Sequence, residues 1–239
     1  FLYFGLGFLS MGTSGLTAQA WGAQNQCEVG LVFWRALTVA LSMSLLLILL
    51  QVPLGRIGFH FVDATPEVLI HARPYFQIRI WAAPATLSLM VIQGWFIGTQ
   101  NARTPMILTV VVNVFNIVGN LVFVYGFGMN SDGVAYGTLC AQYLGLLIAF
   151  RIMNTMASPL HQPVNWQDVL LLSALRRYFS INLDLFLRTL NLIVVFAFFT
   201  LASSWQGSLI LAANSILMQP WAFISFAFDG FAYAAQSLV

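Results

Sequence analysis

Long apolar segments dominate this 239-residue chain, and charged residues rarely interrupt them. Charged residues make up 7% of the chain, against about 25% in a typical soluble domain, whereas hydrophobic residues make up 60%. A soluble fold of this length does not have enough interior to bury so much apolar surface. The sequence therefore predicts an integral membrane protein.

The apolar segments have the length of membrane-spanning helices. A helix needs about 20 residues to cross roughly 30 Å of hydrocarbon. Seven segments of the chain have a suitable length: 1–23, 29–52, 68–99, 105–127, 133–156, 178–203 and 207–239. A transmembrane β-barrel would instead show segments of about ten residues in which polar and apolar side chains alternate strictly. We therefore expect an all-α, polytopic transmembrane bundle with about seven spans, in which both ends of the chain fall inside helices.

The distribution of arginine predicts the orientation of these spans. Four arginines fall in connections that lie on one side when the spans alternate in direction: Arg103, Arg151, Arg176 and Arg177. Arg56 and Arg73 fall on the opposite side, accompanied by Asp63 and Glu67. Because basic residues concentrate on the cytoplasmic side of membrane proteins, the connections 99–105 and 156–178 are predicted to be cytoplasmic.

The longest of these connections, residues 156–178, carries a helical signal of its own. Residues 165–168 resemble a capping box, and an apolar run followed by two arginines comes directly after them. This pattern predicts a short helix that lies in the membrane interface. A crossover of this kind joins two helix bundles in many transporters, and a plain cytoplasmic linker is the alternative.

A stripe of polar residues follows one face of the 105–127 span. Thr109, Asn113, Asn116 and Asn120 are spaced i, i+4, i+7 and i+11, so their side chains share one side of a helix. We interpret the stripe as the lining of a cavity. The alternative is hydrogen bonding between helices, which is worth about 0.6 kcal/mol per contact.

The last two spans carry charged residues, which cost about 2.5–3.5 kcal/mol each on insertion scales. Asp184 and Arg188 lie one turn apart and are spaced for an intrahelical ion pair. The last span carries Asn214 and Asp229. Because the two spans run in opposite directions, the three charges should lie at similar depth, where Arg188 could bridge both carboxylates. We hypothesise a proton- or cation-coupling site or a cytoplasmic gate, with a static tie between helices as the alternative.

Several classes of function lack the residues that they need. The chain has no zinc-protease, nucleophile-elbow or phosphate-loop motif and no cysteine cluster, and its three histidines are scattered. A net charge of +2 is too small for a nucleic-acid partner, which needs a clustered basic face. We expect a secondary transporter that is not an enzyme and has no catalytic residue, metal or cofactor.

Four segments resemble the DinF branch of the multidrug and toxic-compound extrusion family, and the likeness extends along essentially the whole chain. The segments are SGLTAQAWGA (14–23), LFLRTL (185–190), ANSILM (213–218) and FDGFAYA (228–234). The resemblance implies twelve spans in two pseudo-symmetric six-helix lobes around a central cavity. The chain would then run from the second span into the eighth. Its expected parts are most of the first lobe, a cytoplasmic crossover and the first two spans of the second lobe: 1–157, 158–177 and 178–239.

The resemblance also implies roles for particular positions. Asn116 and Asn120 would face an ion pocket of the first lobe. Four residues would be polar positions of the second lobe: Asp184, Arg188, Asn214 and Asp229. Asn120 stands where many relatives have Asp, so this position cannot titrate, although its amide oxygen could still ligate sodium. The family's acidic residue on the first span lies outside this chain.

The function that the resemblance implies is export of amphiphilic, often cationic, organic compounds across the bacterial inner membrane in exchange for protons or sodium. We expect a monomer that contacts membrane lipid and a small organic substrate. A flippase for lipid-linked or polysaccharide substrates is the alternative within the superfamily. Such a protein needs a strongly cationic central cavity, for which Arg188 is the only good candidate. A membrane-embedded enzyme and a non-transporting scaffold are rivals from other classes.

Overall fold

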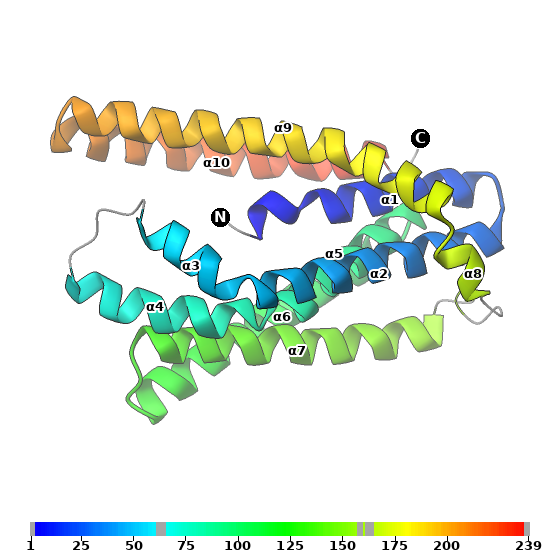
Figure 1. The fold of residues 1–239 in the computed structure, drawn as a ribbon, viewed down its shortest axis with the longest axis horizontal. Coiled ribbons are helices and arrows are strands. Elements are labelled where there is room, and N and C mark those ends of the chain that lie inside the picture. The colour runs from blue at the N-terminus through cyan, green and yellow to red at the C-terminus, as the bar shows by residue number, and fades with distance from the viewer. Residues whose placement is uncertain (1–2, 61–65, 157–159, 161–164, 237–239) are drawn as a thin grey trace.

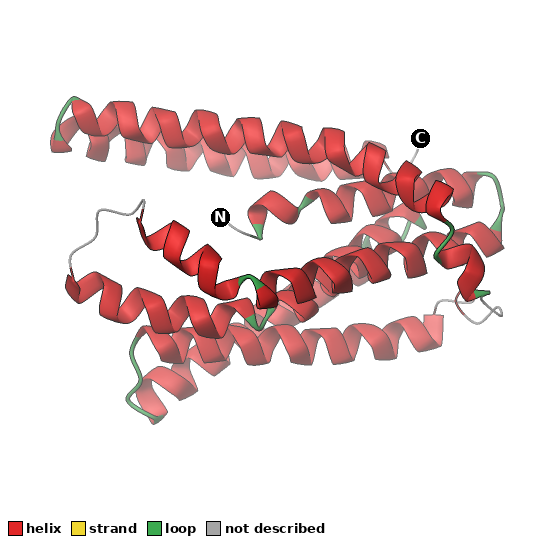
Figure 2. Cartoon of the chain, in the orientation of Figure 1, coloured by secondary structure: helices red, strands yellow, loops and turns green. Residues whose placement is uncertain are grey.

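The computed structural model describes residues 3–60, 66–156, 160 and 165–236, and these residues are helical apart from short connections (Figures 1 and 2). No strand occurs among them. The elements in chain order are η1 (Phe4–Leu6), α1 (Phe8–Gly22), α2 (Gln26–Leu49), α3 (Gln51–His60), α4 (Pro66–Ile80), α5 (Ala83–Gly98), α6 (Arg103–Leu121), a π-helical turn η2 (Val122–Gly126), α7 (Ser131–Met156), α8 (Trp166–Val169), α9 (Leu172–Trp205) and α10 (Ser208–Gln236).

The predicted all-α transmembrane bundle is confirmed, and each predicted span coincides with a helix or a pair of helices. Among the described residues, four helical stretches are long and apolar enough to cross a membrane: Gln26–Leu49, Arg103–Gly126, Ser131–Met156 and Tyr178–Ser203. A bent pair, Leu69–Ile80 with Ala83–Gly98, makes a fifth if it is counted as one span. By contrast, α1 has 15 residues, which gives it a length of about 22 Å.

The predicted 68–99 span is broken into α4 and α5, which meet at an angle of 55°. Pro84 lies in the first turn of α5, where a residue without a backbone N–H leaves no helical hydrogen bond unmade. A continuous helix would need that N–H, so the break falls just before Pro84. Pro74 lies inside α4 and Pro220 lies inside α10, and neither of these two helices ends at its proline.

Helix α5 is the centre of the first bundle, where it contacts α1, α2, α6 and α7. Twelve of its 16 residues are buried. Gly94 and Gly98 lie against the backbone oxygens of Ser10 and Ser14 on α1, so closely that a Cβ at either glycine would collide with them. Small residues four apart allow two membrane helices to pack at this separation. Van der Waals contact between backbones therefore holds α1 on α5.

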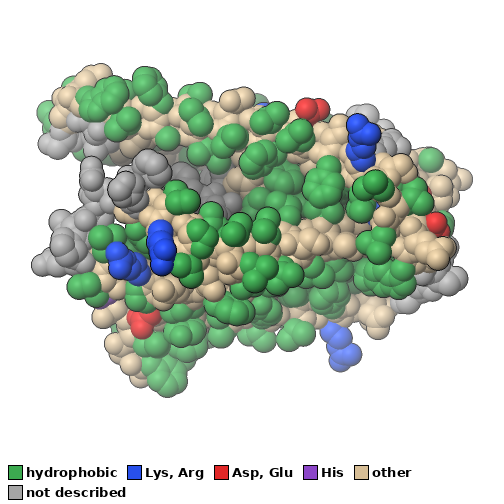
Figure 3. Space-filling view, viewed as in Figure 1, with side chains coloured by type: hydrophobic (Ala, Val, Ile, Leu, Met, Phe, Trp, Pro, Cys, Tyr) green, Lys and Arg blue, Asp and Glu red, His purple; other side chains and the backbone are tan. Residues whose placement is uncertain are grey.

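Helices α9 and α10 form an antiparallel hairpin that lies along one side of this bundle (Figure 1). Gly207 makes the turn between them with a φ of +107°, a conformation that favours glycine. The hairpin contacts the bundle mainly through α9, which packs on α1 and η1. Large apolar side chains cover much of the outer face of the molecule (Figure 3), as expected of helices that face lipid.

The crossover differs from the predicted interfacial helix. Asn165 caps α8 by accepting a hydrogen bond from the Gln167 N–H at 3.2 Å, as the capping signal predicts, but α8 is only four residues long. In a continuous helix, the Asp168 carbonyl would accept the N–H of Leu172. Instead it accepts hydrogen bonds from Arg35. The chain bends after α8, and Arg176 lies in α9.

Candidate functional site

The polar stripe of α6 lies at the seam between α6 and α7. Asn116 Nδ2 donates to Thr138 Oγ1 at 2.8 Å, and Asn120 Nδ2 donates to Asn116 Oδ1 at 3.0 Å. Thr109 accepts a hydrogen bond from Gln93 of α5 at 3.2 Å. The stripe thus forms hydrogen bonds to both neighbouring helices, α5 and α7. Such bonding between helices is the alternative to a cavity lining that the sequence leaves open. Its role in lining a cavity stays a prediction.

Two glycines bring the backbones of this seam together. A Cβ on Gly119 would approach the Cα of Gly137 to 3.0 Å, and a Cβ on Gly137 would approach the Asn120 nitrogen to 2.8 Å. The Asn120 Oδ1 atom is buried and has no hydrogen-bond partner. A buried acceptor without a partner is destabilising by about 1–3 kcal/mol. Within the stripe, this oxygen is therefore the atom best suited to accept a proton donor or a cation.

Asn113, the remaining residue of the stripe, has an exposed side chain. It lies one turn from Asn116 on the same face of α6, but among the described residues it has no hydrogen-bond partner. Asn113 thus differs from the other three residues of the stripe, which all form side-chain hydrogen bonds.

For the predicted charged group on the last two spans, the described residues bear only on the pair Asp184 and Arg188. Asp184 and Arg188 are both exposed on α9, and among the described charged side chains they form no ion pair. Asn214 Nδ2 donates to Ser203 Oγ at 2.8 Å, close to the α9–α10 turn. Ser203 is 19 positions from Asp184 along α9, about 28 Å. Asp229 belongs to α10, and its side chain lies outside the described residues.

A buried arginine that the sequence analysis did not select joins α2 to the crossover. Arg35 is 9% exposed, and its Nη1 lies 2.6 Å from Glu28 Oε1. Its Nε and Nη2 atoms donate to the Asp168 carbonyl oxygen at 3.3 and 3.0 Å. Trp34 packs edge-on against Trp166, with ring centroids 5.7 Å apart. An arginine inside the apolar 29–52 span was the available signal, because such a charge needs a partner.

A second polar contact joins the first bundle to the hairpin, and we call it the α1–α9 joint. It consists of Gly12 and Thr13 on α1 with Tyr178 and Asn182 on α9. The Tyr178 and Thr13 hydroxyls lie 3.0 Å apart, and Asn182 Nδ2 donates to the Tyr178 carbonyl at 2.7 Å. Tyr178 and Asn182 are each 2% exposed. The Asn182 amide fills the space above Gly12, where a Cβ would collide with it.

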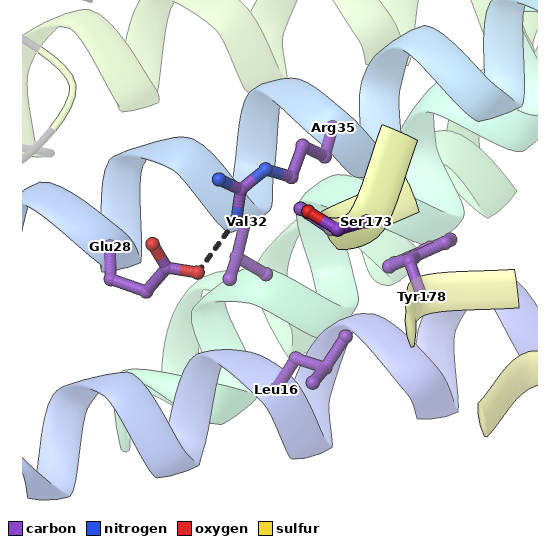
Figure 4. A pocket seen from close by; sticks show the side chains of 7 residues that line it. Leu16, Glu28, Val32, Arg35, Ser173 and Tyr178 are labelled. Carbon is purple, nitrogen blue, oxygen red and sulfur yellow. Dashed lines mark hydrogen bonds and ion pairs between the residues drawn. The ribbon is translucent and has the colours of Figure 1, made fainter. Parts of the chain in front are cut away.

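A cavity of about 330 Å³ lies beside this joint, between α1, α2 and the start of α9 (Figure 4). Its lining residues are Leu16, Glu28, Val32, Arg35, Ser173, Ala174 and Tyr178. Both of its charges belong to the ion pair between Glu28 and Arg35. Nowhere in the described part of the chain do three or more His, Cys, Asp or Glu residues gather as metal ligands would.

Comparison with known proteins gives a consistent picture. The MatE family model matches residues 1–122. The chain is 37% identical over 237 residues to DNA damage-inducible protein F of Escherichia coli K12, which covers 99% of this chain and 52% of that protein. A crystal structure of MATE in the straight conformation superposes with a TM-score of 0.83 at 20% identity, covering 99% of this chain and 53% of the other. An outward-facing multidrug resistance MATE transporter gives a TM-score of 0.77 at 18% identity, with the same coverage. The chain spans about half the length of these proteins.

Proposed function

This chain belongs to the MatE family, and we propose that the protein containing it is a secondary antiporter that exports organic, amphiphilic and often cationic compounds in exchange for protons or sodium. The observation that carries the proposal is the 37% identity to DNA damage-inducible protein F across 99% of the chain. Other relatives of lower identity include a probable multidrug resistance protein of Synechocystis. We place the protein in the bacterial inner membrane, where an ion gradient is available to drive export.

The α1–α9 joint supports a mechanism in which two lobes rock against each other. The helices α1 to α7 form one packed bundle, whereas the α9–α10 hairpin would open the second lobe. In alternating access, such lobes move as bodies about a central site. Under the predicted orientation, α9 begins on the cytoplasmic side, so Tyr178 and Asn182 lie in its cytoplasmic part, whereas Gly12 and Thr13 lie near the middle of the predicted 1–23 span. Because the joint connects the two lobes, it would separate when they rock to open the central site to the cytoplasm.

The crossover supplies the point about which α9 would move. Arg35 and Trp34 hold α8 on α2, which belongs to the first bundle. Leu170 and Leu171 follow α8 and separate it from α9. Bending at these two residues would let α9 move while α8 stays with the first bundle. A hinge needs only a few residues at the end of an element to absorb such a change.

Asn120 and the charged residues of α9 are the proposed ion and substrate contacts. The buried Oδ1 atom of Asn120 lacks a hydrogen-bond partner, so it could ligate sodium or accept a proton donor. Asp184 and Arg188 are exposed on α9, where they would be available to a cavity completed by further helices. Asn214 would serve the opposite end of the hairpin, because it bonds to Ser203. In this proposal, coupling ion and substrate occupy these sites in turn.

The test uses the full-length protein reconstituted in proteoliposomes, with efflux of a cationic dye measured under a proton gradient and, separately, under a sodium gradient. The proposal predicts that at least one gradient accelerates efflux above that of empty vesicles. Efflux that responds to neither gradient would contradict it. Replacement of Asp184 by Asn should slow gradient-driven efflux, whereas replacement of exposed Arg151 by Gln serves as the matched control at a site outside the proposed pathway.

A further inference from the structure

A second and larger cavity lies at the opposite end of the molecule, between α3 and α4. Its volume is about 830 Å³. Its lining residues are Gln51, Val52, Gly55, Arg56, Phe59, Arg73, Phe76, Gln77 and Trp81. Proximity of the two helices rests on Gly55, where a Cβ would lie 3.3 Å from the Phe76 ring. The Phe59 and Phe76 rings meet edge to face with their centroids 5.8 Å apart. Aromatic rings therefore line part of the cleft.

From the lengths of the helices, we expect the cleft at the level of the lipid headgroups. Helix α2 has 24 residues and is therefore about 36 Å long, whereas the hydrocarbon core is roughly 30 Å thick. Gln51 follows α2 almost directly, so α3 begins where the hydrocarbon ends. The bent span reaches the same level, because Leu69 and Gly98 delimit a longer stretch than one crossing requires. Polar side chains of α3 and α4 thus face the interfacial layer.

Two arginines give the cleft a positive charge that the described residues do not neutralise. Arg56 and Arg73 are both exposed, and within the described ranges neither has a hydrogen bond or an ion pair. Figure 3 shows two basic side chains next to each other over α3 and α4. Two guanidinium groups that line one cleft present several N–H donors to a single anion. Gln51 and Gln77 add amide donors to the same cleft.

An apolar border adjoins this charged cleft. Val52, Ile57 and Ile70 are 57%, 58% and 67% exposed, and they belong to the same two helices as the arginines. The ligand that matches such a surface has a negatively charged head and an apolar body. A free phosphate would satisfy only the arginines, and an organic cation would be repelled by them.

We propose that the α3–α4 cleft binds the headgroup of an acidic phospholipid, such as phosphatidylglycerol. The phosphate would lie between Arg56 and Arg73, and the acyl chains would follow the apolar border into the bilayer. Such a lipid would fix α3 against the start of the bent α4–α5 span. The inference does not depend on the transport activity proposed above.

The test measures lipid binding to the purified full-length protein by native mass spectrometry after delipidation. Phosphatidylglycerol and phosphatidylcholine are titrated in parallel. We expect the wild-type protein to prefer phosphatidylglycerol. Since each arginine near an anionic surface contributes about fivefold to affinity, R56Q/R73Q should lower the affinity for phosphatidylglycerol about 25-fold and leave that for phosphatidylcholine unchanged. R56Q and R73Q alone should each lower it about fivefold, which keeps the test open if the double variant fails to fold.

A matched control removes the same charge elsewhere. R151Q/R176Q changes two exposed arginines at the other end of the molecule and should bind phosphatidylglycerol as the wild type does. Equal affinity in the two double variants, or no preference for phosphatidylglycerol in the wild type, would overturn the proposal. Inorganic phosphate and glycerol 3-phosphate form a second arm. Displacement of the lipid by either at low millimolar concentration would assign the cleft to a free phosphate and refute the lipid site.

Discussion

The α6–α7 seam and the α1–α9 joint both pair a glycine with a buried amide, but they differ in what the glycine meets. At the seam, a Cβ on Gly137 would press on the Asn120 amide oxygen and also on the backbone of Gly119 and Asn120. At the joint, the three atoms nearest to a Cβ on Gly12 all belong to the side chain of Asn182. Backbone cannot move aside without shifting a whole helix, whereas an amide can rotate. We therefore interpret the α6–α7 seam as a permanent contact and the α1–α9 joint as a contact that can separate.

The connectivity of the two regions supports the same distinction. Helices α6 and α7 are consecutive and are joined by the turn η2 and a short loop. Thr13 and Tyr178, by contrast, are 165 residues apart in sequence, and α9 reaches α1 only after the crossover. Close packing thus joins helices that are consecutive within the first bundle, whereas the polar joint connects that bundle to the α9–α10 hairpin.

The largest expected effect is that of Gly137→Ala. We predict that it destabilises the protein by about 3 kcal/mol, at the upper end of overpacking effects, because the new methyl group would press on backbone atoms. Thermal unfolding in detergent, followed by intrinsic fluorescence, measures the loss. Gly22→Ala is the control, because nothing lies within 4 Å of a Cβ at Gly22. Equal midpoints for the two variants would show that the seam is not tightly packed.

Arg35→Gln should have the next largest effect. We predict a destabilisation of about 2 kcal/mol: the pair with Glu28 and the bonds to the Asp168 carbonyl are both lost, but Glu28 keeps contact with solvent. Limited proteolysis should cut the crossover faster than in the wild type. Glu28→Gln should have a smaller effect, because Arg35 would still hold the carbonyl. Unchanged proteolysis in Arg35→Gln would mean that this side chain does not fix α8.

Gly12→Ala should cost about 1 kcal/mol, the lower end of the overpacking range, because the Asn182 amide can rotate away. Its main consequence should be a looser α1–α9 joint. Alkylation of a cysteine placed at Ala174, in the cavity beside the joint, should then be faster than in the wild-type background. A loss of stability as large as that in Gly137→Ala would remove the distinction between the two regions.

A comparably small effect is expected at Asn116. Asn116→Ala removes the hydrogen bond to Thr138 of α7, and such bonds between membrane helices average about 0.6 kcal/mol. It also removes the bond that Asn120 donates to Asn116 within α6. Asn113→Ala, on the same face but exposed, should leave the unfolding midpoint unchanged. If both variants instead have the stability of the wild type and slow efflux to the same extent, the whole stripe lines the transport pathway, as the sequence predicts.

The sequence predicts the helices well because apolar length alone defines a membrane span. It also predicts the Asn165 cap, and it places Asn116 and Asn120 on one face of α6, since both features depend on local spacing. What that face meets could not be predicted, because Thr138 and Gly137 come from another helix. The role of Arg35 was missed for the same reason, since its partner is a backbone carbonyl 133 residues away.

The predicted pairing of Asp184 with Arg188 is the opposite case, in which the spacing predicted a contact that the described residues do not show. A spacing of four residues permits an ion pair between Asp184 and Arg188, but it does not require one. Both side chains are exposed, and an exposed pair gains little from contact. Spacing thus predicts which groups share a helical face, whereas burial decides whether they pair.

The most direct test of the separable joint is a reversible cross-link. In a background without Cys27 and Cys140, cysteines at Gly12 and Asn182 should form a disulfide across the joint, and cysteines at Asn116 and Thr138 should form one across the seam. The account predicts that gradient-driven efflux stops in the 12–182 protein, returns after reduction, and continues throughout in the 116–138 protein. Efflux that continues with the 12–182 disulfide closed would contradict it.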